Sequence, residues 1–560
     1  MGSRSATRSS LACVQCRNQH LKCDSVRPIC ARCLTLSKPC SYPDSRRGGR
    51  LGTAAERAQT RRVALPNSPG TAMPSSADSS PSGASGGTAL RHVPLSDTAS
   101  IPSDTMPRET DIDSRLLDLY YQYFHPSHPF VLPQRALRAR LQSCESSSLR
   151  QLANVMRYIG SFYAESLPES TEYEEHVDYT TMDGFTVQAT LLLALAKSMC
   201  DDSAGATGLL ALAIAQATGI GMNTIDFANA VVGLDPVLAE SWRRTWWMIY
   251  VVDTQFAIIR WDFHQLLADH TPEVDLPCDE ARYNRLDIPM TSPSFKEYQN
   301  REYALLEQTY SSFAYYIEAS SIYASSLQAS TQYKSIPHAE TVCSDWEATI
   351  VSWFLMLPPH LRELPVKSTV SDQLMFQAHM MMHTSLAFIH RPLSSLQYDS
   401  AEERSSCRPP PPPLNTSINP IDASKHEEHS TKLFQAIRKQ NQCLVLLPIR
   451  AVQLSPFVIC MIACCTIAHL VGCKVAFDAE ETRAARSRIR VTLGTLKHYE
   501  DIWPRAKRMI RELKLIANDI LQAEALCAAP PVAKVSFPAS EESLFVSMLG
   551  EQWMNPFETA

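Results

Sequence analysis

The sequence predicts two unlike parts, a small cysteine-rich module and a large all-α domain. Six cysteines fall within residues 13–40, whereas apolar residues repeat with the period of an α-helix from residue 111 onward. Between these parts, more than half of residues 63–110 are Pro, Ser, Gly or Thr. That composition offers too little apolar surface to offset chain entropy, so we expect a flexible linker between module and domain.

The six cysteines form two matching halves, each with the pattern Cys-x2-Cys-x6-Cys. They are Cys13, Cys16, Cys23, Cys30, Cys33 and Cys40. Zinc takes four tetrahedral thiolates at about 2.3 Å, so six cysteines complete two sites only if two sulfurs bridge the ions. A segment this short cannot build a hydrophobic core. We therefore expect a binuclear cluster with two zinc ions per chain, whose binding supplies the folding free energy.

A disulfide framework and an iron–sulfur cluster are the alternative uses of these cysteines. A disulfide framework would require a secreted chain, but residues 1–11 are polar and lack the apolar run of a signal peptide. Iron–sulfur clusters are also held by thiolates. The duplicated halves favour zinc over an iron–sulfur cluster.

The residues around the cysteines resemble a known family. Ala12-Cys13-Val14-Gln15-Cys16-Arg17 and Pro28-Ile29-Cys30-Ala31-Arg32-Cys33 closely resemble the fungal six-cysteine binuclear zinc cluster family of transcription factors. The resemblance implies that Cys13 and Cys30 bridge the two ions. It leaves Cys16 and Cys23 on one ion and Cys33 and Cys40 on the other.

The same resemblance implies a mode of DNA recognition. Residues 17–22 are expected to form a short helix, which the family places in the major groove of double-stranded DNA. Gln19 and His20 then occupy the base-reading positions, and the residues that hold backbone phosphates are Arg17, Lys22 and Arg32. The family commonly has lysine or arginine at the two base-reading positions, so its usual CGG-type triplet is not carried over to this chain.

The charge distribution favours the same partner. Residues 1–62 carry a net charge of +10, whereas the whole chain carries −6 and the remainder therefore −16. A basic head on an acidic body is typical of a nucleic-acid binder whose body avoids DNA.

The sequence predicts seven segments. They are a disordered tail (1–9), the zinc cluster domain (10–45), a linker that is first basic and then rich in Pro, Ser, Gly and Thr (46–110), an all-α regulatory domain (111–400), a polyproline-containing loop (401–427), a helical continuation of the regulatory domain (428–529) and an acidic-hydrophobic tail (530–560). No apolar heptads follow the cluster, so no coiled coil is expected there and the oligomeric state stays open.

Helical periodicity defines the elements of the regulatory domain. Helices are expected over 116–124, 149–162, 185–199, 206–220, 240–261, 298–328, 338–357, 371–391, 428–447, 456–473, 482–500 and 505–527. The helices 185–199 and 206–220 are nearly all apolar, which predicts a buried antiparallel pair. Residues 111–400 resemble the fungal-specific regulatory domain in their Tyr/Phe-rich opening, in Ala217–Met222 and in Trp242-Arg243-Arg244-Thr245-Trp246-Trp247.

Four features of the body suggest other functions, and each is expected to be structural. His379 and His383 have the i, i+4 spacing of metal ligands, but the glutamate of a zinc protease motif is absent. Cys460 and Cys464 lack a second ligand pair nearby. Residues 459–471 are too short for a membrane span, which favours a core helix and no membrane partner. The basic residues of the last helix are expected to face solvent; they are Arg505, Lys507, Arg508, Arg511 and Lys514.

The predicted function is that of a nuclear, zinc-dependent, sequence-specific DNA-binding transcription factor. By family resemblance it serves RNA polymerase II and activates a fungal metabolic or secondary-metabolite gene cluster. The composition of residues 530–560 is typical of segments that fold on a coactivator. The alternative is a repressor, or a regulator whose helical domain binds a small-molecule effector. The sequence shows no nucleophile, acid–base pair or phosphate loop, so an enzyme is not expected.

Overall fold

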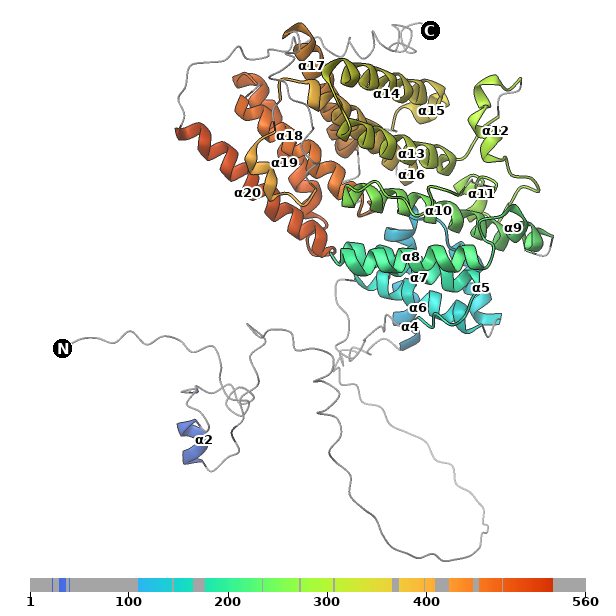
Figure 1. Ribbon diagram of the computed structural model, residues 1–560. Helices are drawn as coiled ribbons and strands as arrows, with labels where there is room; N and C mark the ends of the chain where they lie inside the picture. The colour runs from blue at the N-terminus through green and yellow to red at the C-terminus, as the bar shows by residue number, and fades with distance from the viewer. Residues whose placement is uncertain are drawn as a thin grey trace, which may run out of the picture. The chain divides into compact units, whose positions relative to one another are not determined.

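The computed structural model describes residues 23, 30–36, 40, 109–143, 146–164, 177–233, 235–270, 273–305, 308–364, 372–396, 398–407, 423–446, 453–475 and 477–526. Among these residues, the elements of regular secondary structure are helices. The chain divides into two compact units, Met1–Ile101 and Pro102–Ala560. Of the helices formed by the described residues, the short helix α2 (Ala31–Thr35) belongs to the first unit and the others belong to the second (Figure 1).

The second unit begins with a layer of helices around an antiparallel pair, drawn from blue to green in Figure 1. Its elements are α4 (Glu109–Leu119), the π-helical turn η1 (Tyr120–Phe124), the 3-10 turn η2 (His125–Ser127), α5 (Gln134–Ser143), α6 (Ser147–Ser161), α7 (Gly184–Met199) and α8 (Ser203–Gly219). α7 packs against both α6 and α8, and α4 packs against α6. A Cβ on Gly160 of α6 would clash with the Leu116 carbonyl oxygen of α4, so glycine permits this close helix crossing.

α10 crosses the middle of the unit and carries its most buried polar network. The elements here are α9 (Ile225–Val232), α10 (Pro236–Arg260), α11 (Glu280–Asn284), α12 (Phe295–Gln299) and the 3-10 turn η3 (Arg301–Tyr303). The fully buried Glu240 accepts hydrogen bonds from Arg243 Nε at 3.0 Å and Arg244 Nε at 2.8 Å. Arg244 also donates to the carbonyl oxygens of Pro129 and Cys278, and thereby ties α10 to two distant loops.

A second group of helices packs on the other side of α10. Its elements are α13 (Ser312–Thr331), α14 (Ile336–Met356), α15 (Pro359–Arg362), α16 (Gln373–His390), the 3-10 turns η4 (Arg391–Leu393) and η5 (Ser400–Arg404), and α17 (Ala423–Leu446). α13 packs on α10 and α16, and α16 also contacts α14 and α17. Every residue of α16 is buried, so this helix is the centre of the group.

The last three helices form a layer on α16 and α17. They are α18 (Val458–Val475), α19 (Ala479–Lys497) and α20 (Pro504–Leu526). The prediction that this segment is too short for a membrane span is wrong, because α18 has 18 residues and is apolar enough to cross a membrane. However, 78% of these residues are buried inside the protein. The helix packs against α16, α17, α19 and α20, as expected of the predicted core helix.

Local side chains fix where many of these helices begin. Each of seven N-cap side chains accepts a hydrogen bond from a backbone N–H of the first turn, an arrangement worth about 1 kcal/mol per cap. These residues are Asp183, Asp202, Asp235, Ser311, Ser335, Asp372 and Asp478.

Most of the predicted helices are confirmed to within a few residues, and so is the contact between α7 and α8. The single helix predicted over 298–328 is wrong. α12 ends at Gln299, where the side chain of Asn300 donates to the Lys296 carbonyl at 2.8 Å, and α13 begins only after its cap Ser311. α17 begins at Ala423, five residues before the predicted 428. The short helices α5, α9, α11, α12 and α15 were not predicted.

Candidate metal centre and nucleic-acid interface

Three of the six predicted zinc ligands lie together in the first unit. Cys30 precedes α2, Cys33 lies within it and Cys40 follows it. The sulfur atoms of these three residues all lie within 4.8 Å of one another. Thiolates around one tetrahedral zinc ion lie about 3.8 Å apart, so the observed grouping fits this ion.

Burial and backbone hydrogen bonds also fit thiolate ligands. Cys30 is fully buried, Cys33 is 3% exposed, and the half-buried Cys23 and Cys40 pack against them. The backbone N–H of Cys33 donates to Cys30 Sγ, and that of Cys30 donates to Cys40 Sγ, both at 3.4 Å. Such N–H donors compensate the negative charge of a thiolate, which supports metal binding by these sulfurs.

Of the predicted DNA contacts, the structure describes Arg32. It lies on α2 with its side chain exposed, as a phosphate contact requires. The other predicted residues lie outside the described residues: Cys13, Cys16, Arg17, Gln19, His20 and Lys22, together with the expected helix 17–22. The predicted tail 530–560 and most of the linker 46–110 lie outside them as well.

The histidine pair in the body is engaged in core packing, as predicted. His379 Nε2–H donates to the Leu361 carbonyl at 2.9 Å, and its ring packs edge-on against Trp353 and Phe354. Burial lowers the pKa of His379 to about 4. The ring of His383 stacks on Phe354. Both imidazoles therefore serve as neutral aromatic parts of the core.

The predicted solvated basic face of α20 needs two corrections. Lys507, Arg511 and Lys514 are exposed, but Arg508 is half-buried and pairs with Asp201 at 2.9 Å, and Arg505 is only 3% exposed. Its Nη2 donates to Cys460 Sγ on α18 at 3.1 Å. The sequence places both residues on helices but does not show that their faces meet.

Cys460 has an unusual environment for a thiol. A hydrogen bond from Cys407 lowers its pKa, and the Arg505 guanidinium lowers it further, although burial opposes both effects. The thiol of Cys464 donates to the backbone carbonyl of Cys407 at 3.0 Å, not to the Cys407 thiol. Cys460 and Cys464 therefore do not share a ligand position, in agreement with the predicted structural role.

One group of chemically active side chains was not anticipated from the sequence. Cys343, His390 and His429 place one sulfur and two nitrogen atoms within 4.8 Å of one another. These residues are 39 to 86 positions apart in the chain, so no local motif signals them. A hollow of about 710 Å³ lies beside them between α14 and α17.

Comparison with known proteins places the chain among fungal regulators. Residues 11–49 match the family described as the fungal Zn(2)-Cys(6) binuclear cluster domain, and residues 117–432 match the fungal specific transcription factor domain. The chain is 28% identical over 564 residues to the C6 finger domain transcription factor iacK of Pestalotiopsis fici, covering 92% of this chain and 81% of that protein. It is 42% identical over 77 residues to transcription factor lfc1 of Flammulina velutipes, covering 14% and 25% of the two chains. No solved structure gives a significant match.

Proposed function

Because the chain belongs to the fungal-specific transcription factor family with a Zn(2)-Cys(6) cluster, we propose that it activates a metabolic or secondary-metabolite gene cluster transcribed by RNA polymerase II. Family membership makes it a DNA-binding transcription factor with two zinc ions, acting in the nucleus, and not an enzyme. The proposal adds the residues that hold the metal, the residues that read DNA and the direction of regulation.

All six cysteines of the cluster domain hold the zinc ions, with Cys13 and Cys30 shared between them. The grouping of the Cys30, Cys33 and Cys40 sulfurs supports this assignment. The bound ions supply the folding free energy that so short a segment cannot obtain from a core.

Residues 17–22 enter the major groove of double-stranded DNA. Gln19 and His20 contact base edges, whereas Arg17, Lys22 and Arg32 hold phosphates. The exposure of Arg32 and the net charge of +10 on residues 1–62 support this division. Residues 530–560 bind a coactivator, for which their alternating acidic and apolar residues are suited.

The observation that carries the proposal is the convergence of three cysteine sulfurs, two from buried residues and one from a half-buried residue, within the most cationic part of the chain. It is tested by selecting binding sites for the zinc-loaded full chain from random duplex DNA. His20→Ala should then lose about 1 to 3 kcal/mol of discrimination between the selected site and random DNA. Lys22→Ala should weaken binding to both equally, because a phosphate contact carries no sequence information.

The dependence of affinity on salt provides a second check. If about five cations of the head meet phosphates, the logarithm of the affinity should fall with the logarithm of salt concentration at a slope of about −4 to −5. Failure to select any common site, or an affinity insensitive to salt, would contradict the proposal. An unchanged ratio of specific to random binding in His20→Ala would transfer base reading to Gln19.

A further inference from the structure

Three helices of the regulatory domain bring Cys343, His390 and His429 to one point. Cys343 lies on α14, His390 is the last residue of α16, and His429 lies on α17. His390 Nδ1 is 3.3 Å from Cys343 Sγ and 2.9 Å from His429 Nδ1. Cys343 and His390 are each 1% exposed, whereas His429 is half-buried.

Hydrogen bonding alone does not account well for this arrangement. An imidazole Nδ1 carries either one proton or one lone pair, yet Nδ1 of His390 faces two groups at once. A metal ion between the three atoms would use all of them. A tetrahedral zinc ion with Zn–S of about 2.3 Å and Zn–N of about 2.0–2.1 Å places sulfur and nitrogen about 3.6 Å apart and two nitrogens about 3.4 Å apart. The observed separation of Cys343 Sγ and His390 Nδ1 is close to the first value, and the two Nδ1 atoms, 2.9 Å apart, would move apart by about 0.5 Å when the ion binds.

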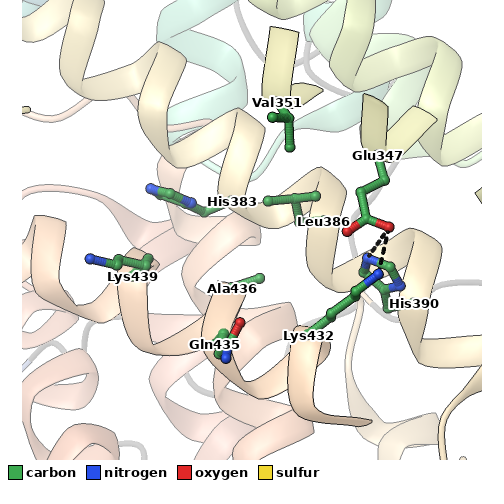
Figure 2. Close-up of a pocket in the computed structure, with 9 residues that line it drawn as sticks. All are labelled: Glu347, Val351, His383, Leu386, His390, Lys432, Gln435, Ala436 and Lys439. Carbon is green, nitrogen blue, oxygen red and sulfur yellow. Dashed lines mark hydrogen bonds and ion pairs between the residues drawn. The ribbon is translucent and has the colours of Figure 1, made fainter. Parts of the chain in front are cut away.

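His390 has a carboxylate beyond its second ring nitrogen, where many metal-ligating histidines have one, at a distance longer than a hydrogen bond. Its second ring nitrogen, Nε2, lies 3.8 Å from Glu347 Oε2, and Glu347 is in turn held by Lys432 Nζ at 2.9 Å. Figure 2 shows the Glu347 carboxylate directed at both partners. A carboxylate behind the non-ligating nitrogen orients the ring and raises its basicity in zinc sites. Glu347 would therefore be a positioning residue.

Solvent lies close to this group of side chains. His429 is half-buried, and a cavity of about 20 Å³ is lined by His390, Glu347 and Lys432 among others. An open hollow of about 710 Å³ shares Glu347, Val351, Lys432 and Gln435 with that cavity as lining residues. The hollow therefore brings water next to the residues around His390.

We propose that Cys343, His390 and His429 bind a zinc ion, with water from the hollow as fourth ligand. One thiolate and two imidazoles select zinc-like ions over magnesium or calcium, which prefer oxygen ligands. The Cys343 thiol releases its proton to solvent when the ion binds. The ion would fasten α17 to α14 and α16, so the helical body would sense zinc independently of the DNA-binding cluster.

Counting bound metal in the full chain tests this site. After saturation with zinc and removal of loosely bound metal with a weak chelator, elemental analysis should find three ions per chain. Cys343→Ser and His429→Gln should each hold two. Cys443→Ser, which removes another buried thiol from α17, is the matched control and should hold three.

Two further variants separate this site from the cluster. Cys30→Ser removes a proposed bridging ligand and should leave one ion per chain, whereas Cys343→Ser should retain the two cluster ions and DNA binding. Glu347→Gln should keep three ions at saturation but weaken the affinity of the third about 10- to 100-fold. His429→Gln changes a half-buried side chain, so it serves if Cys343→Ser does not fold.

A zinc-saturated wild-type chain with only two ions would overturn the proposal. Three ions in wild type and in both the Cys343 and His429 variants would overturn it as well. The three side chains would then form a hydrogen-bonded cluster, and the proposed function of the cluster domain would be unaffected.

Discussion

Replacing Arg244 with methionine should destabilise the regulatory domain far more than the same replacement of its neighbour Arg243. Both side chains are buried and both donate to Glu240. Arg244 alone also donates to the Pro129 carbonyl at 3.1 Å and the Cys278 carbonyl at 2.5 Å. Methionine retains much of the apolar bulk, so the comparison isolates the polar contacts.

The expected magnitudes follow from these contacts. Hydrogen bonds to charged groups contribute about 1.5–3 kcal/mol each, but they are not additive. Removing one partner of a buried ion pair costs about 3–5 kcal/mol, and Arg244→Met also leaves two buried carbonyls without this donor. Its guanidinium further stacks on the Tyr283 ring at 4.2 Å. We expect a loss of about 3–5 kcal/mol for Arg244→Met and about 1–2 kcal/mol for Arg243→Met, which leaves Glu240 paired with Arg244.

Urea denaturation of the full chain, followed by far-ultraviolet circular dichroism, measures the two losses. The free energy of unfolding should be about 1–4 kcal/mol lower for Arg244→Met than for Arg243→Met, the difference between the two expected losses. Equal losses, or a larger loss for Arg243→Met, would refute the assignment of Arg244 as the central anchor of α10.

Three other predictions concern the packing and titration of the body. Burial lowers the pKa of His469 to about 3, whereas in the unfolded chain it is about 6.5. The unfolded state therefore binds a proton below pH 6.5 that the native state excludes, so this residue should destabilise the fold by about 2 kcal/mol at pH 5 relative to pH 8. His469→Gln should remove that part of the pH dependence in urea denaturation, and an unchanged dependence would contradict the assignment. Gly160→Ala should lower the free energy of unfolding by about 1–3 kcal/mol, because its Cβ overpacks against α4. Gly494 of α19 has open space around it, so Gly494→Ala should raise the free energy of unfolding by up to about 1 kcal/mol in the same assay. Cys460, with its lowered pKa, should react with iodoacetamide before the fully buried thiols of the body, as followed by peptide mass spectrometry. Arg505→Met should slow the alkylation of Cys460. An unchanged alkylation rate in this variant would count against the contact between Arg505 and Cys460.

Much of the helical body was predictable because its signals are local. α7 and α8 combine apolar runs with the capping residues Asp183 and Asp202, so their bounds and pairing followed from the sequence. The failure over 298–328 came from ignoring such signals. Asn300 and Ser311 terminate α12 and begin α13, and both are polar residues that compete with helix continuation through their own backbone bonds.

The cysteine spacing by itself was sufficient to predict a binuclear zinc cluster, because six cysteines within 28 residues have few other uses in this setting. The sequence also determined that Arg505 and Cys460 lie on helices, but not that they touch. Likewise, nothing in the spacing of Cys343, His390 and His429 indicates that α14, α16 and α17 bring them within 4.8 Å. Helical periodicity tells which side of one helix is apolar. Only the packing of neighbouring helices decides which polar side chains meet, because it depends on how far each helix is rotated and displaced against the next.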